Sequence, residues 1–529
     1  MSAKQLVPAW SGASYYEHQE LGVRWMMSME EDGHQIPDTD TILRGGILGD
    51  KMGVGKTIQA LGLIANGSAQ NTLIVTPLAV KKQWEDELIR ANVNVYTPQE
   101  WGGKWIIQTN KQCEKSVYLA HYDKIANKPS LTKLQHFDRI ILDEAHTIRN
   151  AKTKKCQAIL NIPATYKWAL TATPILNTMK DVLTYLIFIG YPVTGKSWLP
   201  EHEACIKQVY LSRIQSECKA PPGLIMPPTP IEETIMMDFT CSQEELVYSG
   251  ILKNEEAQWR RAKSQGDKLE LFSIFMRLRQ VSINPQIYTN ARQAEPHGWT
   301  GPLFYGPSRK FMELSHLMRD AYEAKEQHRW IVFCQFHSEM DLLKSFLNAL
   351  PFTGSLLQYH GGMSIRERNA TIARSKQISP DCKQDVFLIQ LKAGSTGLNL
   401  QHYDRIVFMS PWWTPAEMEQ AKGRAVRIGQ TKVVKIYNLI LNAENIFNID
   451  SFMMTKVLEK KELADEFESW STHRKIASDE HINLTLDQNG PETECASTSR
   501  CPSTSRCAST NECVSTNECV STNNYICTK

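Results

Sequence analysis

A glycine-rich segment at residues 49–57, GDKMGVGKT, combines residue types that can bind a triphosphate. Its glycines let backbone N–H groups wrap around phosphate oxygens. Lys56 can reach the β- and γ-phosphates, and the Thr57 hydroxyl can coordinate magnesium. The pattern GxxxxGK[ST] has Asp50 in place of its first glycine. The cofactor-binding residues predicted in this segment are Asp50, Lys51, Met52, Gly53, Val54, Gly55, Lys56 and Thr57.

A second chemical segment, IILDEAH at 140–146, is an apolar run that ends in two acids. Asp143 can hold magnesium through water, and Glu144 can orient and deprotonate an attacking water. A solvated strand end would carry similar residues. The preceding phosphate-binding segment favours ATP hydrolysis, with Thr57 and Asp143 at the metal.

Three smaller features fit this chemistry. The amide of Gln19, on a helical stretch before the glycine-rich segment, can donate to and accept from the edge of adenine. Thr171 and Thr173 in LTATP, 170–174, can sense whether a γ-phosphate is present. With these two threonines we group His146 and Gln420 as predicted coupling residues.

The stretch QAKGRAVRIGQ, 420–430, places Arg424 and Arg427 three apart on an expected short helix. Two guanidiniums on one face repel each other, so an anion should lie opposite them. An arginine from another lobe can neutralise charge that builds on the γ-phosphate. The alternative is a solvated basic helix. The predicted catalytic residues are therefore Lys56, Asp143, Glu144, Arg424 and Arg427.

Two further segments have the chemistry of nucleic-acid contacts. In LKAGSTGLNL, 391–400, Lys392, Ser395 and Thr396 can bind backbone phosphates, although a plain glycine-rich turn has the same composition. In SPWWTP, 410–415, Trp412 and Trp413 either pack in the core or stack on a base or sugar. We predict Trp413 as the DNA contact of the pair.

The elements that position these residues follow a repeating pattern. Short apolar runs alternate with helical stretches in the first third of the chain, and the pattern returns after residue 328. This is typical of parallel sheets covered on both faces, so the fold class is α/β with two lobes. Residues 201–305 contain the proline-broken segment 220–233 and amphipathic helices, which predict a helical insert. The expected domains are 1–200, 201–305, 306–475 and a tail, 476–529.

The tail has a hexapeptide repeat with six cysteines between Cys495 and Cys527. Its low apolar content cannot offset the entropy of ordering, so we predict disorder. The alternative is a metal or redox role for the thiols, although their spacing is not that of a CxxC zinc site.

Composition narrows the function classes. The chain has 529 residues and a net charge of +2, so a nucleic-acid surface must be a local groove. The seven cysteines before residue 480 show no paired spacing, which is typical of a reducing compartment. We expect no secretory signal and no membrane span.

The order of these motifs resembles the Swi/Snf-type ATPases of helicase superfamily two, over about residues 10–470. The resemblance extends to IVTPLAVKKQWEDEL at 74–88, MRLRQVSINPQIY at 276–288 and the whole of 405–430. It implies two RecA-like lobes that bind ATP and Mg²⁺ between them. It also implies duplex DNA bound through its backbone, DNA-bound proteins as targets, a monomeric motor and a nuclear location. An ATPase of this kind with few residues outside its two expected lobes resembles those of large DNA viruses. Such a viral protein would act in the host nucleus.

Four positions depart from the family pattern. Lys51 replaces a glutamate, Ala172 a glycine, Thr414 an asparagine and Val426 a histidine. None removes a group that does phosphate chemistry. Val426 and Thr414 affect the expected coupling between the DNA and ATP sites.

Three functions compete. The first is an ATP-dependent duplex DNA translocase that remodels DNA-bound proteins and modulates transcription. The second is a strand-separating helicase acting on DNA or RNA, which shares the DEAH segment and the two-lobe plan. The third is a non-catalytic DNA-binding regulator, against which the presence of Lys56, Glu144 and both arginines argues.

Overall fold

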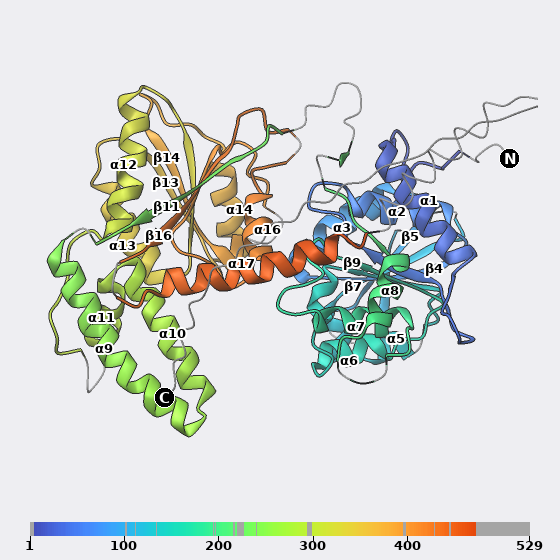
Figure 1. Ribbon diagram of the computed structural model, residues 1–529. Coiled ribbons are helices and arrows are strands. Elements are labelled where there is room, and N and C mark those ends of the chain that lie inside the picture. Colours follow the sequence, from blue (N-terminus) through green and yellow to red (C-terminus); the bar gives the residue numbers. More distant parts are fainter. Residues whose placement is uncertain are drawn as a thin grey trace, which may run out of the picture. The chain divides into compact units, whose positions relative to one another are not determined.

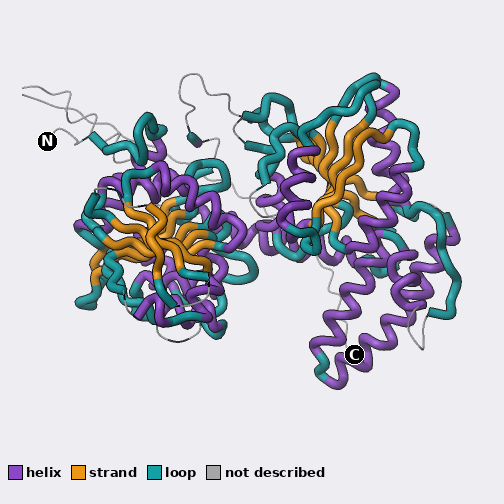
Figure 2. Tube along the Cα trace, turned by 180° about the vertical axis from the view of Figure 1, so that it is seen from behind, coloured by secondary structure: helices purple, strands orange, loops and turns teal. Residues whose placement is uncertain are grey.

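The computed structural model describes residues 5–471 except 101–102, 110, 112, 134, 194, 196, 215–216, 219–226, 240, 294–298, 395–397, 428 and 444–445. Two sheets of mainly parallel strands are each enclosed by helices (Figures 1 and 2). This confirms the predicted α/β class with two lobes. The predicted tail, 476–529, lies outside the described residues.

The first lobe has an eight-stranded sheet in the order β10-β3-β9-β8-β4-β7-β5-β6. All its neighbours pair in parallel except β5 and β6, which are antiparallel. Its elements are α1 (Glu17–Glu31), β1 (His34–Gln35), β2 (Ile42–Leu43), β3 (Gly45–Leu48), α2 (Lys56–Asn66), β4 (Asn71–Thr76), α3 (Leu78–Arg90), β5 (Asn94–Pro98), β6 (Trp105–Thr109), β7 (Ser116–His121), α4 (Tyr122–Asn127), α5 (Ser130–Lys133), β8 (Arg139–Asp143), a 3-10 turn (Ala145–Ile148), α6 (Lys154–Leu160), β9 (Tyr166–Leu170), α7 (Lys180–Ile189), α8 (Pro200–Val209) and β10 (Tyr210–Leu211).

The second lobe has a six-stranded, wholly parallel sheet in the order β11-β16-β15-β12-β14-β13. Its elements are β11 (Ile231–Met237), α9 (Ser242–Gln265), α10 (Lys268–Ile283), α11 (Pro285–Gln293), α12 (Arg309–Glu323), β12 (Arg329–Cys334), α13 (His337–Asn348), β13 (Thr353–Tyr359), α14 (Ile365–Arg374), β14 (Gln384–Gln390), α15 (Leu391–Gly394), β15 (Arg405–Phe408), α16 (Pro415–Lys422), β16 (Lys435–Leu441) and α17 (Ile449–Glu468).

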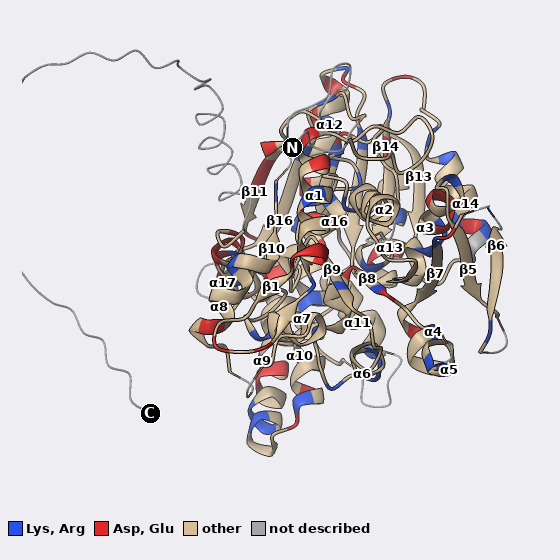
Figure 3. Cartoon of the chain, turned by 90° about the vertical axis from the view of Figure 1, so that its right-hand side faces the viewer, with Lys and Arg blue, Asp and Glu red and all other residues tan. Residues whose placement is uncertain are grey.

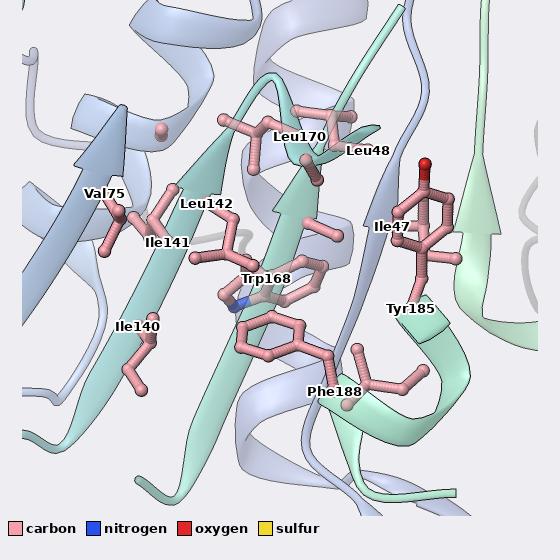
Figure 4. Packing of buried hydrophobic residues seen from close by; sticks show 14 of the residues in the cluster. Ile47, Leu48, Val75, Ile140, Ile141, Leu142, Trp168, Leu170, Tyr185 and Phe188 are labelled. Carbon is pink, nitrogen blue, oxygen red and sulfur yellow. The ribbon is translucent and has the colours of Figure 1, made fainter. Parts of the chain in front are cut away.

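The core of the first lobe lies where its central strands meet α7. Figure 4 shows side chains of β3, β4, β8 and β9 beside Tyr185 and Phe188 of α7. Trp168 of β9 is fully buried and packs edge-on against Trp25 of α1, with ring centroids 5.3 Å apart. Strands covered on both faces need apolar residues on both faces, which explains the uninterrupted apolar runs in the sequence. The chemical residues follow the carboxyl ends of these strands.

The range 201–305 is less helical than the sequence predicts. Within it, β10 joins the first sheet, where Tyr210 is opposite Ile47. The proline-broken segment leads into β11, which pairs with β16 and forms an edge of the second sheet. Most of β11 is solvent-exposed, so it lacks the apolar run that marks a buried strand. Only α9, α10 and α11 fit the expected insert, and the domain boundaries themselves stay a prediction.

Helix α17 connects the two lobes. Near its start, Ile449 and Met453 cluster with residues of α10. In its last turn, Phe467 contacts Tyr210 with ring centroids 4.7 Å apart, and just after its end Trp470 stacks on Trp198 with ring centroids 5.9 Å apart. Residues 467–471, predicted as part of the second lobe, therefore pack in the core of the first.

Charged residues of both signs are interspersed on the surface, as on the hairpin of α9 and α10 (Figure 3). This agrees with the near-neutral net charge. Within the described ranges, no helix is long and apolar enough to cross a bilayer. The same ranges contain no cluster of three or more His, Cys, Asp or Glu side chains that could hold a metal ion.

Candidate active site

The phosphate-binding loop, residues 49–57, connects β3 to α2. Gly53 and Gly55 have φ angles of +84° and +100°, a left-handed conformation that favours glycine. The Lys56 ammonium donates a hydrogen bond to the backbone carbonyl of Asp50 at 2.6 Å. Burial lowers the pKa of Lys56, although the nearby carboxylates, Glu144 first, oppose the change. A loop that places a lysine and a helix N-terminus together fits a phosphate chain.

Helix α1 lies against this loop. The Gln19 amide donates to the carbonyl of Val54 at 3.2 Å, and His18 Nε2 is 2.9 Å from the same oxygen. A Cβ atom on Gly55 would be 2.4 Å from Gln19 Nε2. Gln19 is thus at the loop, as the sequence predicts, and its adenine contact stays a prediction.

Asp143 ends β8 in a buried hydrogen-bonding environment. Its Oδ2 accepts from the Trp84 indole at 2.7 Å and from the Thr76 hydroxyl at 3.2 Å. Burial, and next the negative charge of Glu144, raise the pKa of Asp143 to about 6. A magnesium ion would relieve this cost, and the Asp143 carboxylate with the Thr57 hydroxyl are oxygen donors of the kind that it prefers.

Glu144 has a φ of 48° and a ψ of 54°, which is strained for a residue with a side chain. Burial alone would raise its pKa, but a hydrogen bond and charge from His146, then Lys56 and Arg424, lower it. His146 Nδ1 is 3.3 Å from Glu144 Oε2 and 3.4 Å from the Thr171 hydroxyl. Glu144 therefore stays ionised at neutral pH.

The predicted coupling residues form a connected row behind Glu144. His146 contacts Thr171, whose hydroxyl accepts from the backbone N–H of Thr173 at 3.2 Å. The fourth, Gln420, lies on α16 and lines a cavity of about 730 Å³ together with Thr173 and Met52. The geometry brings these residues together, and their coupling role stays a prediction.

The arginine segment is not a helix at Arg424 and Arg427, contrary to the sequence prediction. Helix α16 ends at Lys422, and both arginines lie in the turns that follow. Gly423 accounts for the ending, because glycine has low helix propensity. A Cβ atom on Gly423 would be 3.4 Å from Met52 Sδ, so this glycine lies against the phosphate-binding loop.

Arg424 faces the chemistry of the first lobe. Its side chain is 8% exposed, and burial lowers its pKa to about 10, against the attraction of Glu144. The positive charge of Arg427 lowers it further. The repulsion predicted from the spacing is thus present, and Glu144 is a carboxylate close enough to act on Arg424.

The predicted DNA contacts are only partly described. Lys392 is exposed on α15, with its ammonium 5.9 Å from the Trp412 ring centroid. Trp412 is buried, whereas Trp413 is half-buried against Phe275 of α10 at 5.9 Å. The structure thus places Trp412 in the core, and the DNA contact of Trp413 stays a prediction. Ser395 and Thr396 lie outside the described residues.

Two predicted cofactor residues turn their side chains away from the phosphate cradle. Asp50 is buried against Arg213, and Lys51 forms an ion pair with Glu468 of α17. Sequence reasoning missed Arg213, because LSRIQS has no recognisable pattern. The available signal was Asp50 itself, since a buried carboxylate requires a partner.

The SNF2-related domain family matches residues 18–287, about half of the chain, and the helicase conserved C-terminal domain matches residues 309–429. A "probable global transactivator" of Orgyia pseudotsugata multicapsid polyhedrosis virus is 27% identical, over 85% of this chain and 90% of the viral protein. This agrees with the resemblance to large-DNA-virus motors.

Cellular relatives are longer. The ISWI chromatin-remodeling complex ATPase ISW1 of Saccharomyces cerevisiae is 25% identical over 86% of this chain, which spans 40% of that protein. The Bacillus subtilis putative ATP-dependent helicase/translocase YwqA is 25% identical over 86% of this chain and 49% of its own. A Sulfolobus solfataricus SWI2/SNF2 ATPase core in complex with dsDNA aligns over 83% of this chain and 90% of its own, with 22% identity and a TM-score of 0.38. On the extent of the family match, the chain belongs to the SNF2-related family and is an ATPase with a helicase-type C-terminal domain.

Proposed function

We propose that this chain is an ATP-dependent duplex DNA translocase that remodels DNA-bound proteins and so modulates transcription. The observation that carries the ATPase half is that the segment of Arg424, from the second lobe, lies against the phosphate-binding loop, where a Cβ atom on Gly423 would be 3.4 Å from Met52 Sδ. Arg424 is there close enough to Glu144 for their charges to interact. Hydrolysis that needs residues of both lobes can be converted into relative motion of the lobes. The relatives named as a chromatin-remodeling ATPase and a helicase/translocase support the choice of DNA.

Each residue has a defined task in ATP hydrolysis. The loop glycines expose backbone N–H groups to the phosphates, and Lys56 exchanges the Asp50 carbonyl for phosphate oxygen. Thr57 and, through water, Asp143 would hold Mg²⁺, which when bound neutralises phosphate charge. Trp84 and Thr76 fix the orientation of the Asp143 carboxylate.

Glu144 is the proposed general base. Its lowered pKa keeps it ionised and able to orient a water and accept its proton. Arg424 and Arg427 would stabilise charge that develops on the γ-phosphate. The row from His146 to Thr171 and Thr173 lies between Glu144 and the cavity between the lobes, where it can respond to loss of the γ-phosphate.

DNA would be held by its backbone, through Lys392, Ser395 and Thr396, with Trp413 as a stacking contact. Such contacts carry little sequence information, which suits a motor that moves along any duplex. We propose a nuclear site of action, the host nucleus for a viral chain, because relatives include chromatin remodellers and a viral transactivator. We further propose a monomeric motor.

The test is ATP turnover with no nucleic acid, duplex DNA, single-stranded DNA or RNA. Glu144→Gln and Lys56→Ala serve as controls, the first retaining ATP binding without turnover. We expect stimulation chiefly by duplex DNA. A preference for RNA would contradict the translocase in favour of a strand-separating helicase. No turnover under any condition would leave only the non-catalytic regulator.

A further inference from the structure

A buried ion pair between Arg213 and Asp50 anchors the phosphate-binding loop. Arg213, two residues after β10, donates from Nε to Asp50 Oδ1 at 3.0 Å and from one terminal nitrogen to Asp50 Oδ2 at 2.6 Å. That nitrogen also donates to Gln59 Oε1 at 2.7 Å. The other terminal nitrogen donates to the backbone carbonyl of His18. Arg213 and Asp50 are 1% and 0% exposed, and Gln59 completes the network by donating to Asp50 Oδ2 at 2.8 Å.

This network connects four segments that build the site. His18 is on α1, next to Gln19, and Gln59 is on α2. Asp50 is in the phosphate-binding loop and Arg213 follows β10. One guanidinium therefore fixes the distance between the helix that carries the proposed adenine contact and the loop that binds phosphates. A planar fork of five donors suits such a junction better than an ammonium does.

The backbone continues the same arrangement. The N–H of Gly49 donates to the Leu211 carbonyl at 2.7 Å, and the N–H of Lys51 to the Arg213 carbonyl at 3.0 Å. The residues on either side of Asp50 are thereby fixed. With its side chain turned toward Arg213, Asp50 presents its carbonyl to the Lys56 ammonium.

A glycine on α1 shows how closely the network is packed. A Cβ atom on Gly22 would be 1.9 Å from Gln59 Oε1 and 2.8 Å from an Arg213 terminal nitrogen. The helical backbone at Gly22 does not itself require glycine. The lack of space for a methyl group means that a small displacement of α1 must move the Arg213 side chain.

We propose that Arg213 is a positioning residue for the nucleotide: through Asp50 it orients Lys56, and through the His18 carbonyl it sets the place of Gln19. This inference rests on the proposed ATPase function. Arg213 touches no reacting group, so its loss should weaken ATP binding more than the chemical step at saturating ATP.

The experiment compares Arg213→Lys with a matched control, Arg139→Lys. Arg139 forms an equally buried, two-pronged ion pair with Glu30 in the last turn of the same helix, α1. The full chain is assayed for the ATP dissociation constant by displacement of a fluorescent nucleotide, for kcat and KM, and for the melting temperature.

We expect both variants to lower the melting temperature by similar amounts. Arg213→Lys alone should raise the ATP dissociation constant and KM about tenfold, equivalent to about 1.4 kcal/mol, with kcat changed less than about threefold. Gly22→Ala, which removes no polar group, should also raise the ATP dissociation constant and KM. If Arg213→Lys does not fold, the ATP affinity of Gly22→Ala tests the proposal in its place.

Equal ATP affinities of Arg213→Lys and Arg139→Lys would overturn the inference, as would a lower kcat at unchanged affinity. If wild-type protein binds ATP and these results appear, Arg213 has only a structural role. If wild-type protein neither binds nor hydrolyses ATP, the proposed function itself fails.

Discussion

Replacing Asp143 with asparagine should abolish hydrolysis yet make the nucleotide-free chain more stable at neutral pH. Burial and the charge of Glu144 raise the pKa of Asp143 from 3.8 to about 6. Between those values the folded chain holds a proton that the unfolded chain has released. The free energy of unfolding therefore falls as pH rises from about 4 to about 6, and the loss persists above that range.

The size of this effect follows from the two pKa values. A difference of about two units corresponds to about 3 kcal/mol at neutral pH. Asparagine never carries the charge, so it avoids this loss. The hydrogen bonds from Trp84 and Thr76 favour the ionised carboxylate, and their effect is already included in the raised pKa of about 6. The pH-dependent part of the difference between the proteins therefore isolates the buried charge.

The assay is thermal unfolding of wild type and Asp143→Asn across pH 4 to 8 without nucleotide or magnesium. We expect the melting temperature of the variant, relative to wild type, to rise by a few degrees between about pH 4.5 and 7. In domains of about 150–250 residues, a change of about 1 kcal/mol in the free energy of unfolding shifts the melting temperature by about 2–4 °C. In a Glu144→Gln background the rise should shrink, since a major cause of the raised pKa is gone. A difference that does not change with pH would refute the buried-charge reasoning.

Three other substitutions test separate parts of the structure. Gly55→Ala should weaken ATP binding at least tenfold by equilibrium titration, because the φ of +100° and the 2.4 Å approach to Gln19 leave no place for a methyl group; binding within twofold of wild type would contradict this. Lys310→Met removes the ion-pair partner of the fully buried Asp450, at 2.5 Å, and should cost about 3–5 kcal/mol in urea unfolding, whereas Lys82→Met, at an exposed lysine, should cost far less. Arg427→Ala should keep ATP affinity but lower turnover about 10³-fold or more, and unchanged turnover would remove this arginine from the mechanism.

Local patterns indicated the candidate catalytic residues of the first lobe. The glycines before Lys56 and the acids after the apolar run 140–142 can be recognised from a few neighbouring residues, because a phosphate-binding loop and a strand end are local structures. The structure accordingly brings Lys56 and Glu144 close enough for their charges to interact. The spacing of Arg424 and Arg427 predicted an anionic partner, for which we proposed the γ-phosphate, but nothing in the segment indicated that Arg424 would lie close enough to Glu144 for their charges to interact.

Contacts between distant parts of the chain could not be predicted. Arg213 is 163 positions from Asp50, and its own segment has no pattern. The motif gives the place of Asp50 in the loop but not the direction of its carboxylate, which lies against Arg213, and the cofactor-binding role of Asp50 stays a prediction. Strand β11 was missed because its exposed edge position removes the apolar signal. The packing of Phe467 and Trp470 in the core of the first lobe is likewise a contact between distant parts of the chain.

The return of the chain to its first lobe limits how far the two lobes can separate. Residues 212–230 pass from β10 to β11, and α17 passes back, so two covalent connections join the lobes. Helix α17 has 20 residues, about 30 Å at 1.5 Å per residue, and a helix resists stretching. While Ile449 stays packed on α10 and Phe467 stays in the core of the first lobe, the two lobes cannot separate beyond the length of this helix, and a wider separation would require α17 to unwind or to leave one of these contacts.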